Sequence, residues 1–267
     1  MYGAIIGDIV GSVYEWNNIK TKDFPLFHRC CGFTDDRVMT IAVAEALLDA
    51  WGQPETARRK ALTDSLQKWG RRYPDAGYGR KFKQWIFSEN PEPYSSWGNG
   101  SAMRVSAAGW LYDTLEETQQ VAKDTAEVTH NHPEGIKGAV ATASVIWMAR
   151  NGCDKKEIRK YVEAEFYPLE KNCDQIREVY QYDGSCQGTV PQAITAFLEG
   201  KDFEDVIRTA VSLGGDCDTL TCIAGGMAEA FYVVPEKLKQ ECRRRITPEM
   251  RMVLDAFEEK RKEIAPK

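Results

Sequence analysis

The spacing of hydrophobic and polar residues follows a helical period along almost the whole chain. Apolar residues recur at intervals of three and four, whereas runs that alternate between apolar and polar residues are rare. Two segments, 140–148 and 220–231, are apolar on nearly every face and rich in alanine and glycine, which is typical of helices buried inside a bundle. The pattern therefore predicts an all-α protein, a compact multi-helix orthogonal bundle with these segments in its core.

Glycine, proline and capping residues add detail to this pattern. Gly3, Gly7 and Gly11 line one side of the first predicted helix, so we expect another backbone to approach that side closely. Thr114 and Asp154 each precede a glutamate by three residues, a capping-box spacing that opens a helix. Prolines near the starts of predicted helices are Pro54, Pro133, Pro191 and Pro248.

Composition and charge restrict the class of protein. Of the 267 residues, 43% are hydrophobic and 28% are charged, the usual proportions of a folded globular protein. Because no repeat or linker interrupts the helical pattern, we expect one domain over residues 1–267. The formal net charge of −5 provides no overall attraction for nucleic acid or acidic membranes. The chain has no long apolar run and no signal-like start, so we expect a cytoplasmic monomer with reduced cysteines.

Two acidic clusters stand where predicted helices begin. The first is Thr-Asp-Asp at 34–36, before a helix that we expect to reach about Trp51, and the second is Asp-Cys-Asp-Thr at 216–219. Helix capping needs one acceptor at each start, but adjacent carboxylates repel each other, and the composition occurs twice. If the helix starts face each other, their all-oxygen donors suit Mg²⁺ or Mn²⁺ better than Zn²⁺. From the residues alone, capping and metal binding both remain open.

Five short motifs occur in order along the chain. They are Gly7-Asp8-x-x-Gly11-Ser12, Thr34-Asp35-Asp36, Gly98-Asn99-Gly100-Ser101-Ala102-Met103-Arg104, His132-Pro133 and Gly214-Gly215-Asp216-x-Asp218-Thr219. Together they resemble the ADP-ribosylglycohydrolase family, from the first residue to about Val234. The resemblance implies an all-α fold with a binuclear Mg²⁺ or Mn²⁺ centre at the base of a cleft. It also implies a hydrolase that removes ADP-ribose from a modified acceptor.

The resemblance also assigns roles to individual residues. It implies two Mg²⁺ (or Mn²⁺) ions with Asp218 as the bridge between them, and the ligands Thr34, Asp35, Asp36, Asp216, Asp218 and Thr219. Glu15, or alternatively Asp36, would guide the attacking water. The implied substrate-binding residues are Ser96, Trp97, Asn99, Gly100 and Ser101 in the cleft, His132 near the diphosphate and ribose, and Tyr78 at the rim.

Simpler readings stand beside several of these assignments. Glu15 could be a surface carboxylate at a helix end, the glycines at 98–100 a turn before a helix, and Tyr78 part of another turn. His130 could be a loop or core histidine, and zinc binding is disfavoured because His28 is the only other imidazole besides His132.

Two other functions also remain open from the sequence. One is a different binuclear-metal hydrolase such as a phosphoesterase, because paired carboxylates on two ions serve phosphate chemistry as well. The other is a non-catalytic ADP-ribose-binding relative. Within the glycohydrolase reading, the motifs leave the acceptor undefined: arginine, serine, a nucleic-acid base or O-acetyl-ADP-ribose would all present the same ADP-ribose half.

Overall fold

The computed structural model describes residues 1–264, and its regular structure over this range is helical. The helices are α1 (Tyr2–Gly11), α2 (Asp35–Asp49), α3 (Glu55–Arg72), α4 (Arg80–Ile86), α5 (Gly100–Met103), α6 (Ser106–Leu111), α7 (Leu115–Glu127), α8 (Pro133–Arg150), α9 (Lys155–Glu165), α10 (Cys173–Val179), α11 (Cys186–Glu199), α12 (Phe203–Leu213), α13 (Cys217–Phe231), α14 (Glu236–Arg245) and α15 (Pro248–Ile264). Between residues 1 and 264 the only strand-like pairing is a single bridge between Gly98 and Ser185. The predicted all-α fold is confirmed.

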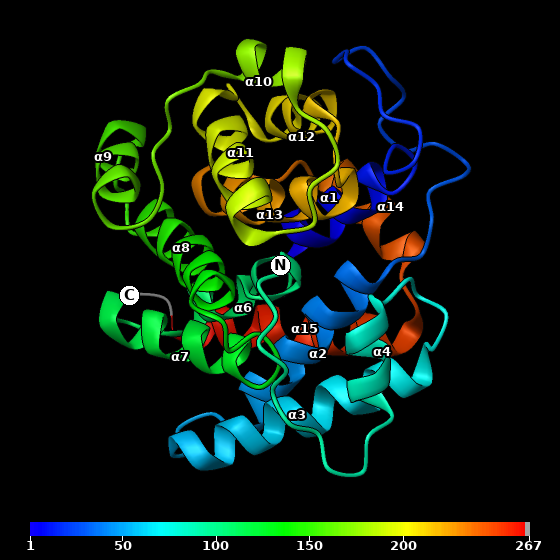
Figure 1. Cartoon of the computed structure of the whole chain (residues 1–267), viewed down its shortest axis with the longest axis vertical. Coiled ribbons are helices and arrows are strands. Elements are labelled where there is room, and N and C mark those ends of the chain that lie inside the picture. Colours follow the sequence, from blue (N-terminus) through cyan, green and yellow to red (C-terminus); the bar gives the residue numbers. More distant parts are fainter. Residues whose placement is uncertain (265–267) are drawn as a thin grey trace.

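Helices α1 and α13 lie side by side in the middle of the molecule (Figure 1). Their backbones almost touch, because the glycine side of α1 faces α13. A methyl group on Gly7 would lie 2.1 Å from the carbonyl oxygen of Thr221, and one on Gly3 would lie 2.1 Å from that of Gly225. At Gly11 the corresponding distance, to the Cys217 oxygen, is 2.4 Å. The close approach predicted from the glycine spacing is confirmed.

The other helices enclose this pair. Helices α11 and α12 pack on α13, and α2 packs against α1, α3 and α15 (Figure 1). Helix α8 packs on α6, α7 and α13, and the predicted buried segments 140–148 and 220–231 lie within α8 and α13. One continuous cluster of buried apolar side chains runs through these contacts. Among residues 1–264, no helix is both long enough and apolar enough to cross a membrane.

The predicted helix starts agree with the structure, with one exception. Asp154 forms the full reciprocal capping box with Glu157, and the Thr114 side chain accepts a hydrogen bond in the first turn of α7. The expected start near Pro191 is wrong, because α11 begins at Cys186. The Ser185 side chain caps it there, so Pro191 lies inside the helix.

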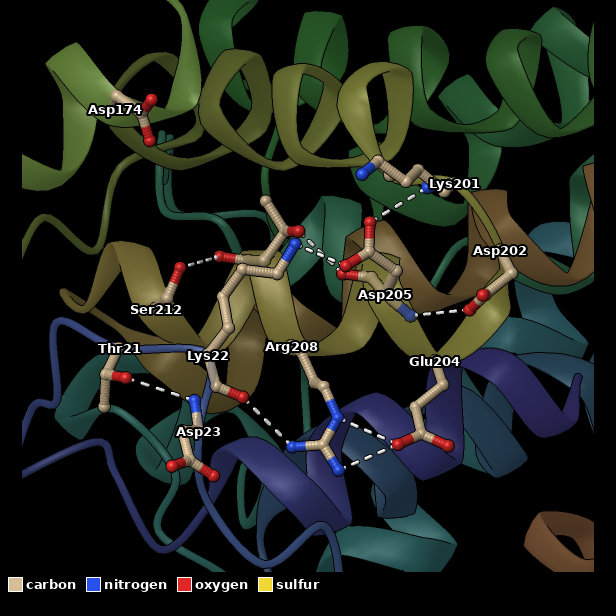
Figure 2. A network of polar contacts seen from close by, with 12 residues as sticks. Thr21, Lys22, Asp23, Asp174, Lys201, Asp202, Glu204, Asp205, Arg208 and Ser212 are labelled. Carbon is tan, nitrogen blue, oxygen red and sulfur yellow. Dashed lines mark hydrogen bonds and ion pairs between the residues drawn. The ribbon is translucent and has the colours of Figure 1, made fainter.

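Residues 12–34 form a long loop between α1 and α2, and helix α12 holds this loop in place (Figure 2). The Arg208 guanidinium donates hydrogen bonds to the backbone oxygens of Lys22, at 3.1 Å, and Phe24, at 2.7 Å. Lys22 in turn forms an ion pair with Asp205. The loop is therefore tied to the helix that directly precedes the second acidic cluster.

We predict that Gly7→Ala destabilises the protein by about 1–3 kcal/mol, the usual cost of overpacking a core. The added methyl group would meet the backbone of Thr221, which cannot rotate away as a side chain could. The midpoint of guanidinium denaturation measures the change. Gly79→Ala is the matched control, because no described atom lies within 4 Å of a methyl group there. Equal midpoints for both variants would contradict the tight α1–α13 contact.

Candidate functional site

The starts of α2 and α13 meet at one cavity. This cavity has a volume of about 570 Å³ and lies beside the end of α1. The six residues expected as metal ligands all line it: Thr34, Asp35, Asp36, Asp216, Asp218 and Thr219. The two acidic clusters, far apart in the sequence, therefore share one site.

Helix capping does not account for these clusters. Thr34 and Asp216 occupy the N-cap positions of α2 and α13, yet within residues 1–264 neither side chain accepts a hydrogen bond from a first-turn amide. The Thr34 hydroxyl instead donates to a carboxylate oxygen of Asp8, and Asp216 accepts a hydrogen bond of 2.8 Å from the Asn99 amide. Both side chains are directed toward other groups of the site.

Five carboxylates at the base of the cavity form two overlapping groups; four of them line the cavity, and Asp8 is fully buried beside them. In each group the oxygens lie within 4.8 Å of one another: Asp8, Asp36 and Asp218 form one group, and Glu15, Asp216 and Asp218 form the other. Asp218 belongs to both groups, which is the position expected of a bridging carboxylate. Each group could hold one cation.

Asp8 is a site residue that the sequence analysis did not assign. It is fully buried on α1, and its carboxylate accepts a hydrogen bond of 2.5 Å from the Arg37 Nε atom. The available signal was a lone carboxylate inside the apolar run at 5–10, because a charge is buried only when something compensates it. Arg37 supplies one positive charge, and among residues 1–264 no lysine or arginine forms an ion pair with the other carboxylates of the two groups.

Burial and mutual repulsion raise the pKa values of these carboxyl groups. For Asp35, Glu15 and Asp36 the larger cause is burial and the next is the charge of Asp218. Together they raise the pKa of Asp35 to about 8 and that of Glu15 to about 7, and they raise the pKa of Asp36 well above its ordinary value. Burial raises the pKa of Asp216 to about 6, and burial with the Asp216 charge raises that of Asp218 well above its ordinary value. Full ionisation at neutral pH is therefore unfavourable without a cation.

The donor atoms fit hard divalent cations. All of them are carboxylate or hydroxyl oxygens, the ligands that Mg²⁺ and Mn²⁺ prefer. One buried oxygen of Asp36 (Oδ1) has no hydrogen-bond partner in residues 1–264, while the other accepts a long hydrogen bond of 3.2 Å from the Thr219 hydroxyl. An orphaned, buried carboxylate oxygen is costly, and a cation at this point would satisfy it.

Glu15 is held at the cavity by a neighbouring asparagine. Glu15 is half-buried and belongs to the long loop after α1. The Asn18 side chain donates hydrogen bonds to the backbone oxygens of Glu15, at 3.0 Å, and Gly215, at 3.0 Å. It also accepts one of 2.7 Å from the Gly215 amide. Asn18 thus fixes the position of Glu15 relative to the cluster at 216–219.

The glycine-rich segment before α5 forms another wall of the cavity. Of the expected substrate-binding residues, Ser96, Asn99 and Gly100 line it. Ser101 is fully buried, and its hydroxyl donates to the Gly135 oxygen at 2.7 Å, so its side chain supports the wall from behind. Trp97 is 53% exposed and lies outside the cavity proper.

Tyr78 and His132 lie differently from the sequence expectation. Tyr78 is buried and packs edge-on against Phe82. Its neighbours in the loop at 76–79, and not its ring, therefore line the cavity. His130 is a buried loop histidine, as its sequence suggested, and it also lines the cavity. His132 instead caps α8 and packs edge-on against Trp97 at 5.4 Å.

Two exposed aromatic residues at the mouth of the cavity were also not predicted from the sequence. The rings of Trp16 and Tyr182 stack with their centroids 5.8 Å apart, and both line the cavity. They are 77% and 55% exposed. Trp16 follows Glu15 directly, so this pair flanks the carboxylate cluster on the solvent side.

The chain resembles known proteins over nearly its full length. A family model described as ADP-ribosylglycohydrolase matches residues 1–265. The ADP-ribosylhydrolase ARH3 of Mus musculus is 26% identical, with 90% of this chain and 85% of that protein covered. ARH3 of Homo sapiens is also 26% identical, with 90% and 87% covered. A solved structure described as an ADP-ribosylglycohydrolase-related protein complex has a TM-score of 0.67 at 23% identity, over 96% of both chains, and shares the fold.

We predict that the cation-free protein loses thermal stability as the pH rises. Asp216, Glu15 and Asp35 have folded-state pKa values of about 6, 7 and 8, above the value of about 4 in unfolded chains. An acid whose pKa is raised by folding favours the folded state while protonated, so this stabilisation is full below pH of about 4 and is lost as the pH rises through the folded-state values.

Melting temperatures in EDTA, measured across this range, test the prediction. Excess Mg²⁺ should reduce the decline, and Asp36→Asn should reduce it without any cation. Asp23→Asn, which changes an exposed acid in the long loop, is the matched control and should melt like the wild type. A melting temperature in EDTA that rises with pH would contradict the prediction.

Proposed function

This chain belongs to the ADP-ribosylglycohydrolase family, and from that membership we propose that it is a divalent-cation-dependent hydrolase that releases ADP-ribose from a modified acceptor. The observation that carries the proposal is the convergence of the two acidic helix starts in one cavity that is also lined by the glycine-rich segment at 98–100. This arrangement provides cation ligands and a ligand-binding wall within a single pocket.

The proposed cofactors are two Mg²⁺ or Mn²⁺ ions. Asp8 and Glu15 join the acidic and hydroxyl residues of the two helix starts around them, with Asp218 shared. When bound, the ions would supply Lewis acidity toward the ribose hydroxyls and a water molecule. Asp36 and Asp216 act as ligands in this proposal, because their buried positions leave them no other partner of opposite charge among the described residues.

The ADP-ribose half of the substrate would lie along the glycine-rich wall. Gly98 and Gly100 allow the backbone to approach the diphosphate closely, and Asn99 links this wall to Asp216 through its side-chain amide. Ser96 offers a hydroxyl beside them, and the exposed Trp97 ring, packed edge-on against His132, provides an aromatic surface beyond the cavity for the far end of the nucleotide.

Glu15 is proposed to guide the water that attacks. The water oxygen forms a bond to the anomeric carbon of the ribose, and the bond from that carbon to the acceptor breaks, with its electron pair going to the acceptor. Glu15 takes the proton of the water. Its position beside Asp216 and Asp218, fixed through Asn18, supports this role.

The acceptor would leave past the stacked rings of Trp16 and Tyr182, which flank the same carboxylates.

A panel of ADP-ribose conjugates tests both the activity and the acceptor: ADP-ribosyl arginine, ADP-ribosyl serine, an ADP-ribosylated base and O-acetyl-ADP-ribose, with generic phosphoesters for comparison. Release of free ADP-ribose from at least one conjugate is expected. Turnover of phosphoesters alone would favour a phosphoesterase, and binding of ADP-ribose without turnover would favour a non-catalytic relative.

We predict that Glu15→Gln lowers kcat by roughly 10²–10⁴-fold, the usual contribution of a positioned general base. The amide keeps the size of the side chain but cannot take the proton of the water. Asp23→Asn removes an exposed acid from the same loop and should keep the wild-type kcat. Equal kcat values for the two variants would remove Glu15 from the mechanism.

Removal of the cations should abolish hydrolysis. We expect no release of ADP-ribose in excess EDTA, and recovery on addition of Mg²⁺ or Mn²⁺. Asp218→Asn should remain inactive after that addition, because it lacks the carboxylate common to both groups. Its melting temperature in EDTA serves as the folding control, and unchanged hydrolysis in excess EDTA would overturn the cation dependence.

A further inference from the structure

A fully buried arginine lies at the glycine-rich end of the cavity. Arg104 is 1% exposed, and within residues 1–264 no carboxylate lies within ion-pair distance of it. Its Nη2 atom donates hydrogen bonds to the Thr125 backbone oxygen, at 2.8 Å, and to the Thr129 hydroxyl, at 2.7 Å. Burial lowers the pKa of Arg104 only to about 10, so the guanidinium remains charged at neutral pH. Burying a charge without an acidic partner costs folding free energy, so a function of Arg104 would explain why it is buried here.

The Thr129 hydroxyl connects Arg104 to His130 by two hydrogen bonds. Because the hydroxyl accepts from Arg104, its own proton is free to be donated. The His130 Nδ1 atom lies 2.7 Å away. The alternative acceptor, the Ala126 backbone oxygen, is 3.5 Å away and already accepts from the backbone amides of Thr129 and His130. The shorter distance favours donation of the hydroxyl proton to Nδ1, which is then unprotonated.

The remaining ring nitrogen of His130 faces the glycine-rich wall. Burial, and next the charge of Arg104, lower the pKa of His130 well below its ordinary value, so the ring is neutral and carries one proton. With Nδ1 accepting, that proton sits on Nε2. A methyl group on Gly100 would lie 3.3 Å from Nε2, and one on Gly98 would lie 3.6 Å from it. The N–H group is thus beside the loop that borders the cavity.

We propose that Arg104 and Thr129 are positioning residues that hold His130 as its Nε2–H tautomer, so that the imidazole donates a hydrogen bond to a diphosphate oxygen of the substrate. The identity of this ligand rests on the proposed function, whereas the tautomer does not. A diphosphate oxygen can only accept, so the opposite tautomer would present a lone pair to it and weaken binding.

The first test is nitrogen NMR of the ligand-free protein at neutral pH. The chain has three histidines, so His28→Asn and His132→Asn identify the His130 signals by elimination. We expect a protonated, pyrrole-type Nε2 and an unprotonated, pyridine-type Nδ1 in the wild type. A protonated Nδ1, or a doubly protonated ring, would overturn the proposal without any variant.

Variants at Thr129 test the relay itself. Thr129→Val removes the hydroxyl at nearly constant volume and should shift the His130 signals away from the pure Nε2–H pattern, whereas Thr129→Ser should keep it. Thr125→Val is the matched control, because it makes the same change one turn earlier, where only the backbone oxygen bonds to Arg104. If Thr129→Val does not fold, the wild-type spectrum and the serine variant still decide the tautomer. An unchanged His130 spectrum in a folded Thr129→Val protein would overturn the relay.

Binding and kinetic measurements test whether His130 contacts the diphosphate of the substrate. Thr129→Val should raise the KM for the ADP-ribosyl substrate, and the Kd for free ADP-ribose, about tenfold, as expected for loss of one charge-assisted hydrogen bond. The kcat should change little, because the diphosphate is bound equally in the ground and transition states. A changed tautomer with unchanged KM and Kd would overturn the diphosphate contact. If no conjugate is hydrolysed and ADP-ribose does not bind, the proposed function fails, while the NMR result still decides the tautomer.

Discussion

The backbone contact between α1 and α13 is the constraint on which the site depends. Gly7 and Gly11 flank Asp8 on α1, and both meet the α13 backbone near Asp218. The absence of side chains at these glycines therefore does more than close the core, because it brings carboxylates from two distant helices within 4.8 Å of one another. Burial of apolar side chains along the α1–α13 contact stabilises the fold, and this offsets the repulsion between Asp8 and Asp218 at the end of the contact.

The cavity has two electrically different ends. Several buried carboxylates crowd its base, and only one of them pairs with Arg37. At the glycine-rich end, the buried Arg104 has no acidic partner in the described part of the chain. A molecule with an anionic diphosphate next to a hydroxyl-rich sugar complements this polarity if cations occupy the base. Within the described part of the chain, each end lacks the counter-charge that the proposed ligand or cations would bring.

Local sequence patterns predicted the helices and both acidic clusters, because helical periodicity and helix-start residues are properties of neighbouring positions. The patterns marked Asp8 only as a lone carboxylate in an apolar run and gave no role to Asp8 or Arg104, since those roles come from partners that only the fold brings near. Tyr78 shows the same limit, because packing against Phe82 turns its ring into the core. The difference between His130 and His132 depends on the turn before α8, and that turn directs only one of them into the cavity.

The order of the elements along the chain bears on how the protein is made. The Asp36 and Thr219 side chains that meet in the site are 183 positions apart, so a ribosome has to release most of the polypeptide before both can be present. Until then α1, apolar along most of its length, lacks the partner that covers it. Contacts of such sequence separation form slowly. A nascent chain that carries only α1 to α12 therefore leaves the glycine side of α1 without its main packing partner, and exposed apolar surface of this kind favours aggregation.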